Sequence, residues 1–496
     1  MLPVMSVIFT ISKKMVLMNR CTSPLLLVSL LLALVSARDL GAATVDEIPA
    51  RPNFIVIFCD DLGWGDLSCY GHPTIATPNL DRMASEGMRL TQFYVAASVC
   101  TPSRAALMTG RYPVRSGMCG KRRVLFPNSV GGLPKSEWTI AEVLKQQGYA
   151  TGMVGKWHLG HLPPYLPTEH GFDSYYGIPY SNDMDKVAPR GVNVFKDPDW
   201  KHFNVPLLSG TQSSGVKEIE RPVDQRTITR RYVERAIDYI RDQEEGQPFF
   251  LYLAHSLPHV PLFRSDEFIG HSRPGLYGDV IEEIDAGVGS ILQELKDRGI
   301  AEKTLVMFTS DNGPWLSFGD QGGSAGPLRN GKGTTFEGGL RVPGLFWMPG
   351  TIPSGVVSAE LASTLDLLPT FAAVSDAALP ADTPLDGYDL SAMLVEQRPS
   401  PRKTMFYYRD YRLMAIRHGR YKAHFITQDS YVPGSNVATD HDPPLLYDLE
   451  IDLGEKRNIA ADHPEIIAEI LKIKGEYEAD MTTAPSQTDR KPDAKR

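Results

Sequence analysis

The sequence predicts an α/β fold in which helices cover both faces of a sheet, followed by a small antiparallel sheet with a helix. Three observations support this prediction. Short apolar runs alternate with helical segments along most of the chain. Beyond about residue 386 the pattern changes to short aromatic and β-branched runs separated by turn residues. A chain of 496 residues also exceeds what one core usually supports, so we expect a large domain and a smaller one.

Buried strands are expected where short runs consist almost entirely of apolar residues. Helices are expected where capping residues bracket a longer segment. One such segment has Thr77 as its N-cap, a proline at its first position and Gly87 after its end. The expected strands of the large sheet are 54–59, 150–154, 249–254 and 305–309. The expected helices are 78–86, 137–147, 227–243 and 279–298.

The C-terminal part predicts the small antiparallel sheet. Its expected strands are 404–408, 413–417, 421–426 and 445–449, and its expected helix is 464–478. The last residues are rich in Thr, Asp, Lys and Pro, which is typical of a loose tail. We therefore expect a large domain over 49–385, a smaller domain over 386–480 and a loose tail over 481–496.

The N-terminus has the composition of an export signal. Lys13, Lys14 and Arg20 precede an apolar run at 24–35, and residues 35–37 have the small-residue spacing of a signal-peptidase site. We expect 1–37 to be a cleaved signal peptide and the mature protein to be secreted, periplasmic or lumenal. The alternative is an uncleaved anchor, but this run is shorter than the roughly 20 apolar residues that span a bilayer. Stable membrane insertion is not expected elsewhere in the chain.

Charge and cysteine content exclude two further classes of protein. The formal net charge is −8 and no basic cluster is evident, so a nucleic-acid partner is not expected. Five cysteines, of which Cys21 lies in the leader, are too few for a disulfide scaffold. Cys59 ends an apolar run and is expected to be a buried thiol. Cys69 and Cys119 lie in glycine-containing loops, and the sequence leaves open a bridge between them.

Polar residues directly follow four of the expected strands. Taken singly, each has an ordinary explanation as a turn residue, a helix cap or a packed histidine. Because ligands in open α/β sheets bind beyond the carboxyl ends of the strands, we expect these residues to share one site. In chain order they are Asp60 and Asp61, Lys156 and His158, His255 and His259, and Asp311 and Asn312.

The acidic members of this group predict a metal site. Adjacent buried carboxylates raise each other's pKa unless a cation compensates them. Three carboxylates and an amide oxygen form a hard ligand set, which favours one Ca²⁺, or less readily Mg²⁺, over Zn²⁺. His158 and His259 then stay free for proton transfer.

Cys100 stands at the predicted start of a short helix that ends at Gly110. The helix dipole and the free backbone N–H groups at such a position favour an anion, either a thiolate or a bound oxyanion. The residues alone leave two readings open, a structural thiol in a loop-to-helix turn and a reactive one, which includes a thiol hydrolase.

The segment CTPSRAALMTGR at 100–111 resembles the signature of the type I, formylglycine-dependent sulfatases, most closely arylsulfatase A and its relatives. The resemblance extends over about 51–458 and includes DDLGWGDLSCYGHPTIATPNLDRMA, TGMVGKWHLG, GIPYSND, SLPHVPLF, SDNGP, GKGTTFEGGLRVP and PPLLYDLEIDLGE. It implies an alkaline-phosphatase-like sulfatase fold, with 49–385 as the catalytic domain, and hydrolysis of aryl or carbohydrate sulfate esters. It also implies a formylglycine-generating enzyme as a partner during maturation, which oxidises Cys100 to formylglycine.

The resemblance also implies a role for individual residues. The expected Ca²⁺ ligands are Asp60, Asp61, Asp311 and Asn312, with the modified Cys100 completing the set. The expected substrate-binding residues are Lys156, Lys332 and Ser181, which contact sulfate, and His441, which lines the mouth of the site. Arg104 and His158 are expected to hold the formylglycine hydrate, Asp311 to act as base, and His259 to protonate the leaving oxygen. One hydroxyl of the hydrate attacks sulfur and the other then expels sulfate.

Two departures and two alternatives accompany this resemblance. The segment 183–213 does not match the Cys-rich loop of the vertebrate enzymes, and no Asn-x-Ser/Thr sequon occurs. The rival enzyme is a phosphonate or phosphodiester hydrolase of the same superfamily, and the rival from another class is a binding protein that has lost turnover. The sequence leaves open the natural ester, among sulfated sugars, sulfated glycolipids and small aryl sulfates, and a homo-oligomeric state.

Overall fold

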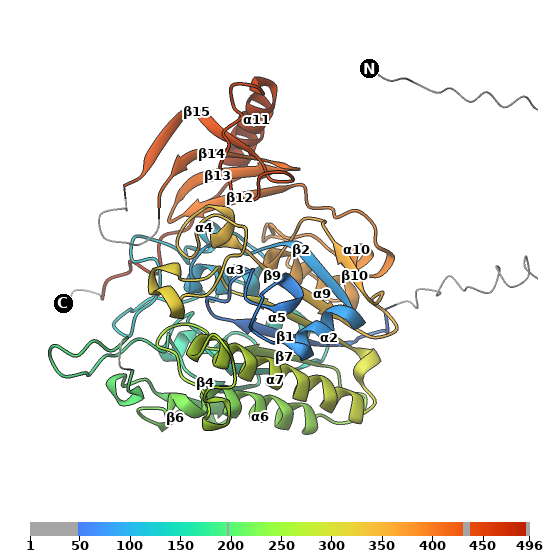
Figure 1. Ribbon diagram of the computed structural model, residues 1–496. Coiled ribbons are helices and arrows are strands. Elements are labelled where there is room, and N and C mark those ends of the chain that lie inside the picture. The colour runs from blue at the N-terminus through green and yellow to red at the C-terminus, as the bar shows by residue number, and fades with distance from the viewer. Residues whose placement is uncertain (1–47, 196–197, 430–436, 493–496) are drawn as a thin grey trace, which may run out of the picture. The chain divides into compact units, whose positions relative to one another are not determined.

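The structure, a computed structural model, describes residues 48–195, 198–429 and 437–492 (Figure 1). The expected export signal at 1–37 lies outside the described residues. Within these ranges, no helix combines the length and the apolar character that crossing a bilayer requires.

A mixed sheet of eleven strands forms the centre of the fold. Its strands are β1 (Asn53–Cys59), β2 (Met88–Tyr94), β3 (Ala150–Gly155), β4 (Ser174–Gly177), β5 (Leu207–Thr211), β6 (Gly215–Glu220), β7 (Phe249–Ala254), β8 (Thr304–Ser310), β9 (Arg341–Trp347), β10 (Val356–Ser358) and β11 (Ala362–Ser363). Their order is β10-β2-β9-β8-β1-β7-β3-β4-β5-β6, with β11 paired to β2. The run β8-β1-β7-β3-β4 is parallel, whereas β9 and β5 pair antiparallel with both neighbours.

Helices cover both faces of this sheet (Figure 1). They are α2 (Pro78–Glu86), α3 (Cys100–Thr109), α4 (Pro113–Ser116), α5 (Ile140–Lys145), α6 (Ile228–Arg241), α7 (Leu276–Asp297), α8 (Glu337–Leu340), α9 (Leu367–Ser375) and α10 (Ser391–Glu396). Successive side chains of a strand point to opposite faces. In β1, Phe54, Val56 and Phe58 therefore belong to the core under α3, α5, α9 and α10, and Ile55 and Ile57 to the core under α2, α6 and α7. The predicted α/β fold is confirmed.

The smaller sheet consists of four antiparallel strands in sequence order, as predicted. They are β12 (Thr404–Arg409), β13 (Arg412–His418), β14 (Tyr421–Thr427) and β15 (Thr439–Asp448), and α11 (Pro464–Asp480) follows them. A buried ion cluster joins this sheet to α8: the Lys422 ammonium lies 3.0 Å from a carboxylate oxygen of Glu337 and 3.0 Å from one of Glu455. The domain boundary expected near residue 386 stays a prediction.

The prediction of a loose tail is wrong for the described part of that segment, 481–492. Ala484 N donates to Val114 O at 3.0 Å and Gln487 N donates to Gly117 O at 2.8 Å. Glycine permits this contact, because a Cβ at Gly117 would lie 2.2 Å from Pro485 O. The polar composition of this segment is typical of a solvated chain, but its backbone N–H groups donate to carbonyls in and just after α4.

Other local predictions also needed correction. The helix expected at 137–147 starts only at Ile140, because Thr139 caps it: its hydroxyl accepts from Glu142 N, and the Glu142 carboxylate accepts from Thr139 N. The pattern did not predict the antiparallel strands β2 and β9 or the β4–β6 extension. The sequence left open a bridge between Cys69 and Cys119, and both are free thiols.

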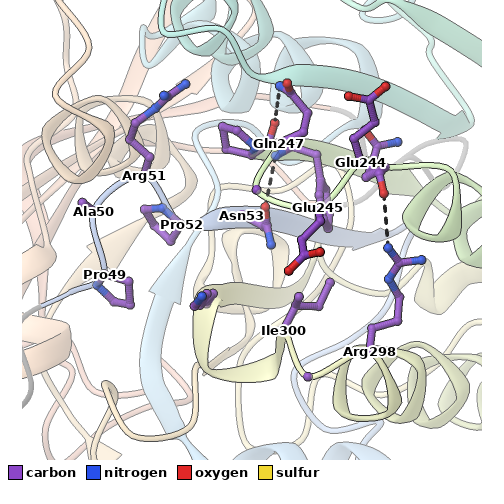
Figure 2. Close-up of a pocket in the computed structure, with 16 residues that line it drawn as sticks. Pro49, Ala50, Arg51, Pro52, Asn53, Glu244, Glu245, Gln247, Arg298 and Ile300 are labelled. Carbon is purple, nitrogen blue, oxygen red and sulfur yellow. Dashed lines mark hydrogen bonds between the residues drawn. The ribbon is translucent and has the colours of Figure 1, made fainter.

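A cavity of about 830 Å³ lies at the amino ends of the parallel strands (Figure 2). Asn53 at the start of β1 and Phe249 at the start of β7 line it, and Asn53 Oδ1 accepts from Phe249 N at 3.2 Å. Its wall combines basic residues such as Arg298 with Glu244 and Glu245. The polar residues that follow β1 and β7 lie at the other ends of these strands, so this cavity is separate from the site that they form.

Candidate active site

The carboxyl ends of four adjacent strands, β8, β1, β7 and β3, place the predicted polar residues along one edge of the sheet. Asp60 and Asp61 follow β1, Asp311 and Asn312 follow β8, Lys156 and His158 follow β3, and His255 and His259 follow β7. All eight are buried. Asp61 and His158 have φ of 68° and 59°, a left-handed conformation that is costly for non-glycine residues and is often retained at functional sites.

Asp60 lies at the centre of the site. Its carboxylate forms an ion pair with the Lys156 ammonium, which also donates to Ser181 Oγ at 3.1 Å. Cys100 Sγ lies 3.5 Å from Asp60 Oδ1. Burial alone would raise the pKa of Asp60, but the surrounding positive charges, Lys156 above all, hold that pKa well below its usual range. Asp60 is therefore ionised.

Helix α3 delivers Cys100 and Arg104 to the same place. The two residues are four apart, and residues with that spacing lie on one face of a helix. Arg104 donates from Nε to Asp311 Oδ2 at 3.0 Å and from Nη1 to the Lys156 carbonyl at 3.0 Å. Its Nη2 lies 2.8 Å from Asp311 Oδ2. The guanidinium is thus fixed, fully buried, one turn from the thiol.

Asp61 connects the remaining members of the site. Lys332 Nζ lies 2.7 Å from Asp61 Oδ1, and Asn312 Nδ2 donates to that same oxygen at 2.7 Å. His259 Nε2 lies 3.7 Å from Asp61 Oδ2. The C-terminal sheet contributes indirectly, because Arg409 of β12 donates to the carbonyl of Gly333, next to Lys332, at 3.0 Å.

Hydrogen bonds define the tautomers of the two site histidines. His259 Nδ1 lies 2.6 Å from Val260 O, and a carbonyl can only accept, so this nitrogen carries the proton. His158 Nε2 lies 2.8 Å from Leu125 O and is protonated for the same reason. His158 Nδ1 is then a buried acceptor without a partner among the described residues. Burial lowers the pKa of both histidines, which favours their neutral forms.

Cys100 is a protonated thiol in this environment. Burial raises its pKa, and the negative charge of Asp60 raises that pKa further. A thiolate, one of the alternatives for a helix N-terminus, is therefore disfavoured, and a thiol hydrolase with it. Burial and the charge of Asp60 also raise the pKa of Asp311, to about 7.

The site gathers atoms that could hold a metal ion. One ligand atom each from Asp60, Asp61, Cys100 and His259 lie within 4.8 Å of one another. Asn312 Oδ1 is buried without a hydrogen-bond partner in the part of the chain that the structure describes. His259 belongs to this group although the sequence assigned it to proton transfer. Asp311 lies next to this group: its Oδ2 accepts from Arg104 Nε at 3.0 Å and its Oδ1 accepts from Asp61 N at 3.1 Å.

Two histidines lie away from this cluster. His441 of β15 hydrogen-bonds through Nε2 to Thr427 Oγ1 at 2.8 Å, and none of the site contacts above includes it. The ring of His255 packs 6.5 Å from that of Tyr232, a residue of the core under α6 and α7.

Sequence reasoning missed two residues that contact the site. Asn182 Nδ2 donates to His259 O at 3.3 Å and to Pro261 O at 3.1 Å, and so braces the histidine loop. The centre of the Trp315 ring lies 5.4 Å from the centre of the His259 ring and 4.2 Å from the Lys332 ammonium. A tryptophan four residues after a strand-end aspartate was the available signal, because such loops border ligand sites.

Two family models match the chain. The family described as Sulfatase matches residues 52–377, and the one described as the C-terminal region of aryl-sulfatase matches residues 400–495. The chain therefore belongs to the sulfatase family, and it is an enzyme that hydrolyses sulfate esters. The family resemblance seen in the sequence is confirmed.

Individual relatives span nearly the whole chain. Arylsulfatase A of Bos taurus is 45% identical over 485 residues, which cover 92% of this chain and 93% of the bovine protein. The N-acetylgalactosamine-6-sulfatase of Canis lupus familiaris is 42% identical over 458 residues, which cover 86% of this chain and 84% of the canine protein. Among solved structures, the PsFucS1 sulfatase from Pseudoalteromonas sp. has a TM-score of 0.80 at 29% identity, covering 91% of this chain and 93% of that one.

Proposed function

We propose that this sulfatase removes sulfate from aryl or carbohydrate sulfate esters by using residue 100 as formylglycine, the oxidised form of its cysteine. The observation that carries the proposal is the setting of Cys100: a buried thiol at the first residue of α3, 3.5 Å from Asp60 and one turn before Arg104. Its raised pKa makes the unmodified thiol a poor nucleophile. The names of the bovine and canine relatives support both substrate classes.

A single Ca²⁺ is the cation that these residues suit best. The proposed ligands are Asp60, Asp61, Asp311 and Asn312, together with the modified residue 100. Asn312 Oδ1 is already a buried acceptor without a partner among the described residues, and it would gain one. Oxygen ligands favour Ca²⁺ or Mg²⁺ over Zn²⁺. Bound there, the cation would neutralise the carboxylates and stabilise negative charge on the transferred group.

Residue 100 would supply two hydroxyls as a hydrated aldehyde, one to attack sulfur and one whose deprotonation releases sulfate. The neighbouring side chains orient it. Arg104 is locked by Asp311 and by the Lys156 carbonyl, so it can donate to a hydroxyl at residue 100 without moving. His158 Nδ1 is the free acceptor that can take a hydrogen bond from the same group. Asp311, which Arg104 holds in place through Oδ2 at 3.0 Å, is the proposed base.

The sulfate group is proposed to bind between two lysines. Lys156 and Lys332 each pair with an aspartate, and Ser181 accepts from Lys156 at 3.1 Å, so these donors are held in place before substrate arrives. His259 has its proton on Nδ1, so Nε2 must gain one before it can protonate the leaving oxygen. The negative charge of a bound sulfate ester would favour that protonation.

Mass spectrometry of the Cys100 peptide tests the proposal. We expect an aldehyde in place of the thiol in active enzyme, and an inactive Cys100→Ala variant. Cys69→Ala is the matched control, because Cys69 is a free thiol away from the site, and it should keep full activity. Active enzyme with an unmodified Cys100 would contradict the mechanism.

A rate comparison separates the rival substrate class. The enzyme should hydrolyse 4-nitrophenyl sulfate much faster than an aryl phosphodiester with the same leaving group, and the opposite ratio would refute the substrate class. Export and maturation by a formylglycine-generating enzyme belong to this proposal, supported by the leader-like composition of 1–37 and by Cys100 in its motif.

A further inference from the structure

An aromatic residue borders the proposed sulfate site on the side of the leaving group. Trp315 is partly exposed, its ring centre lies 5.4 Å from that of His259, and the Lys332 ammonium lies 4.2 Å from it. If Lys332 holds the sulfate and the leaving oxygen faces His259, the organic group attached to that oxygen extends past His259 and Trp315. Trp315 is therefore positioned to contact that group.

Further aromatic rings continue outward from Trp315. Phe318 packs edge-to-face on Trp315 with 4.7 Å between ring centres, and Phe195 lies 5.1 Å from Phe318. The exposed Lys186 places its ammonium 4.4 Å from the centre of the Phe195 ring. These four residues, which we call the aromatic rim, come from two separate loops, and its three rings stay partly exposed. Partly exposed aromatic rings beside a polar site are typical of ligand contacts.

We propose that the aromatic rim is the binding site for the leaving group, and that this group is a saccharide of at least two rings with a second anionic substituent near Lys186. The inference rests on the proposed function, the removal of sulfate from aryl or carbohydrate esters at residue 100. The rings meet at interplanar angles of 74° and 63°, so they form a stepped surface rather than a flat slot for one planar aryl group. A stepped surface can contact the apolar faces of successive sugar rings, and the ammonium complements an outlying sulfate or carboxylate.

Kinetics on matched substrates test this proposal. The substrates are 4-nitrophenyl sulfate, a panel of monosaccharide sulfates, and disaccharides that extend each of them by a ring with a second sulfate. We expect the best disaccharide to exceed its monosaccharide in kcat/KM by about tenfold. Phe318→Ala should raise KM for the disaccharide about tenfold, with kcat and the turnover of 4-nitrophenyl sulfate nearly unchanged. Trp315→Ala should raise KM for the disaccharide at least as much, and Trp315→Phe should restore most of the loss.

Phe318 gives the cleaner variant, because among the described residues its ring packs against those of Trp315 and Phe195 and not against Lys332 or His259. Trp138→Ala is the matched control: Trp138 is 38% exposed and is not among the described residues that form the site. Lys186→Ala should abolish the preference for the second sulfate, and Lys186→Arg should retain it.

Three outcomes would overturn the inference: 4-nitrophenyl sulfate as the only ester hydrolysed, no preference for the disaccharide, or equal effects of Phe318→Ala on all substrates. An enzyme with formylglycine that hydrolyses no sulfate ester would instead refute the proposed function, so the two failures are distinguishable.

Discussion

Replacing Lys422 by methionine should destabilise the protein far more than replacing a surface lysine. The Lys422 side chain is fully buried, and its ammonium lies 3.0 Å from carboxylate oxygens of both Glu337 and Glu455. Methionine has a similar length but no charge, so the variant keeps much of the packing and leaves two buried carboxylates without their shared cation.

The size of the loss follows from the geometry. The two carboxylate oxygens lie at most twice 3.0 Å apart, since both contact the same nitrogen. At an effective dielectric constant of about 20, their repulsion is then about 3 kcal/mol. Removing one partner of a buried ion pair costs about 3–5 kcal/mol. Tyr407 donates to Glu337 at 3.0 Å and His424 lies 2.7 Å from Glu455, which limits the loss, so we expect about 3 kcal/mol.

Equilibrium unfolding in urea measures this loss as a lower midpoint. Lys472→Met is the control, because Lys472 is 77% exposed and lies 3.8 Å from Glu476 on α11. It should cost less than about 0.5 kcal/mol. Adding Glu337→Gln to Lys422→Met removes one of the two uncompensated charges and should recover part of the loss. A Lys422→Met midpoint equal to that of the control would refute the reasoning.

Three further predictions concern pH, packing and catalysis. Burial opposes ionisation of Glu337, but Lys422 lowers its pKa to about 2, below the ordinary 4.5, so its stabilising contribution is present above pH 4.5 and is lost as the pH falls toward 2. Glu337→Gln should flatten the acid side of a plot of Tm against pH, and an unchanged slope would contradict this. Gly117→Ala should make the segment after α11 more sensitive to proteases, because φ of Gly117 is 72° and the new Cβ would lie 2.2 Å from Pro485 O. An unchanged rate of digestion would contradict this prediction. Lys156→Ala should lower kcat/KM for an aryl sulfate about 100-fold, and an unchanged kcat/KM would rule out sulfate binding by Lys156. Dialysis against a chelator should likewise abolish catalysis until Ca²⁺ is returned, and activity that survives dialysis would rule out the proposed Ca²⁺ site.

The central part of the site could be predicted because the parallel strands have a simple pattern. Residues 54–59 are apolar throughout since β1 is buried on both faces, and the polarity changes abruptly at Asp60. The same change from apolar to polar residues after β8 and β3 indicated Asp311 and Lys156 as site residues. Once parallel strands are assumed, their carboxyl ends must meet at one edge, and the shared site follows.

The remaining features depend on contacts between distant segments. β2 mixes buried and partly exposed positions, so its run at Met88–Tyr94 lacks the continuous apolar pattern that marked the central strands. Docking of 481–492 depends on space left by Gly117, which no local pattern reveals. The start of α5 was readable, since Thr139 and Glu142 have the spacing of a capping box. The contact between Trp315 and His259 could not be predicted without the structure, because the two residues are far apart in the sequence.

The hydrogen bond from Arg409 to the Gly333 carbonyl bears on the order in which the protein is made. Ribosomes synthesise chains from the N-terminus, so every residue of the proposed sulfate site emerges before β12 does. The loop that carries Lys332 nevertheless receives its last support from Arg409, and through α8 from Lys422 and Glu455. A nascent chain halted before β12 would hold all the site residues without the strands that brace this loop. Completion of the catalytic site is thereby coupled to completion of synthesis.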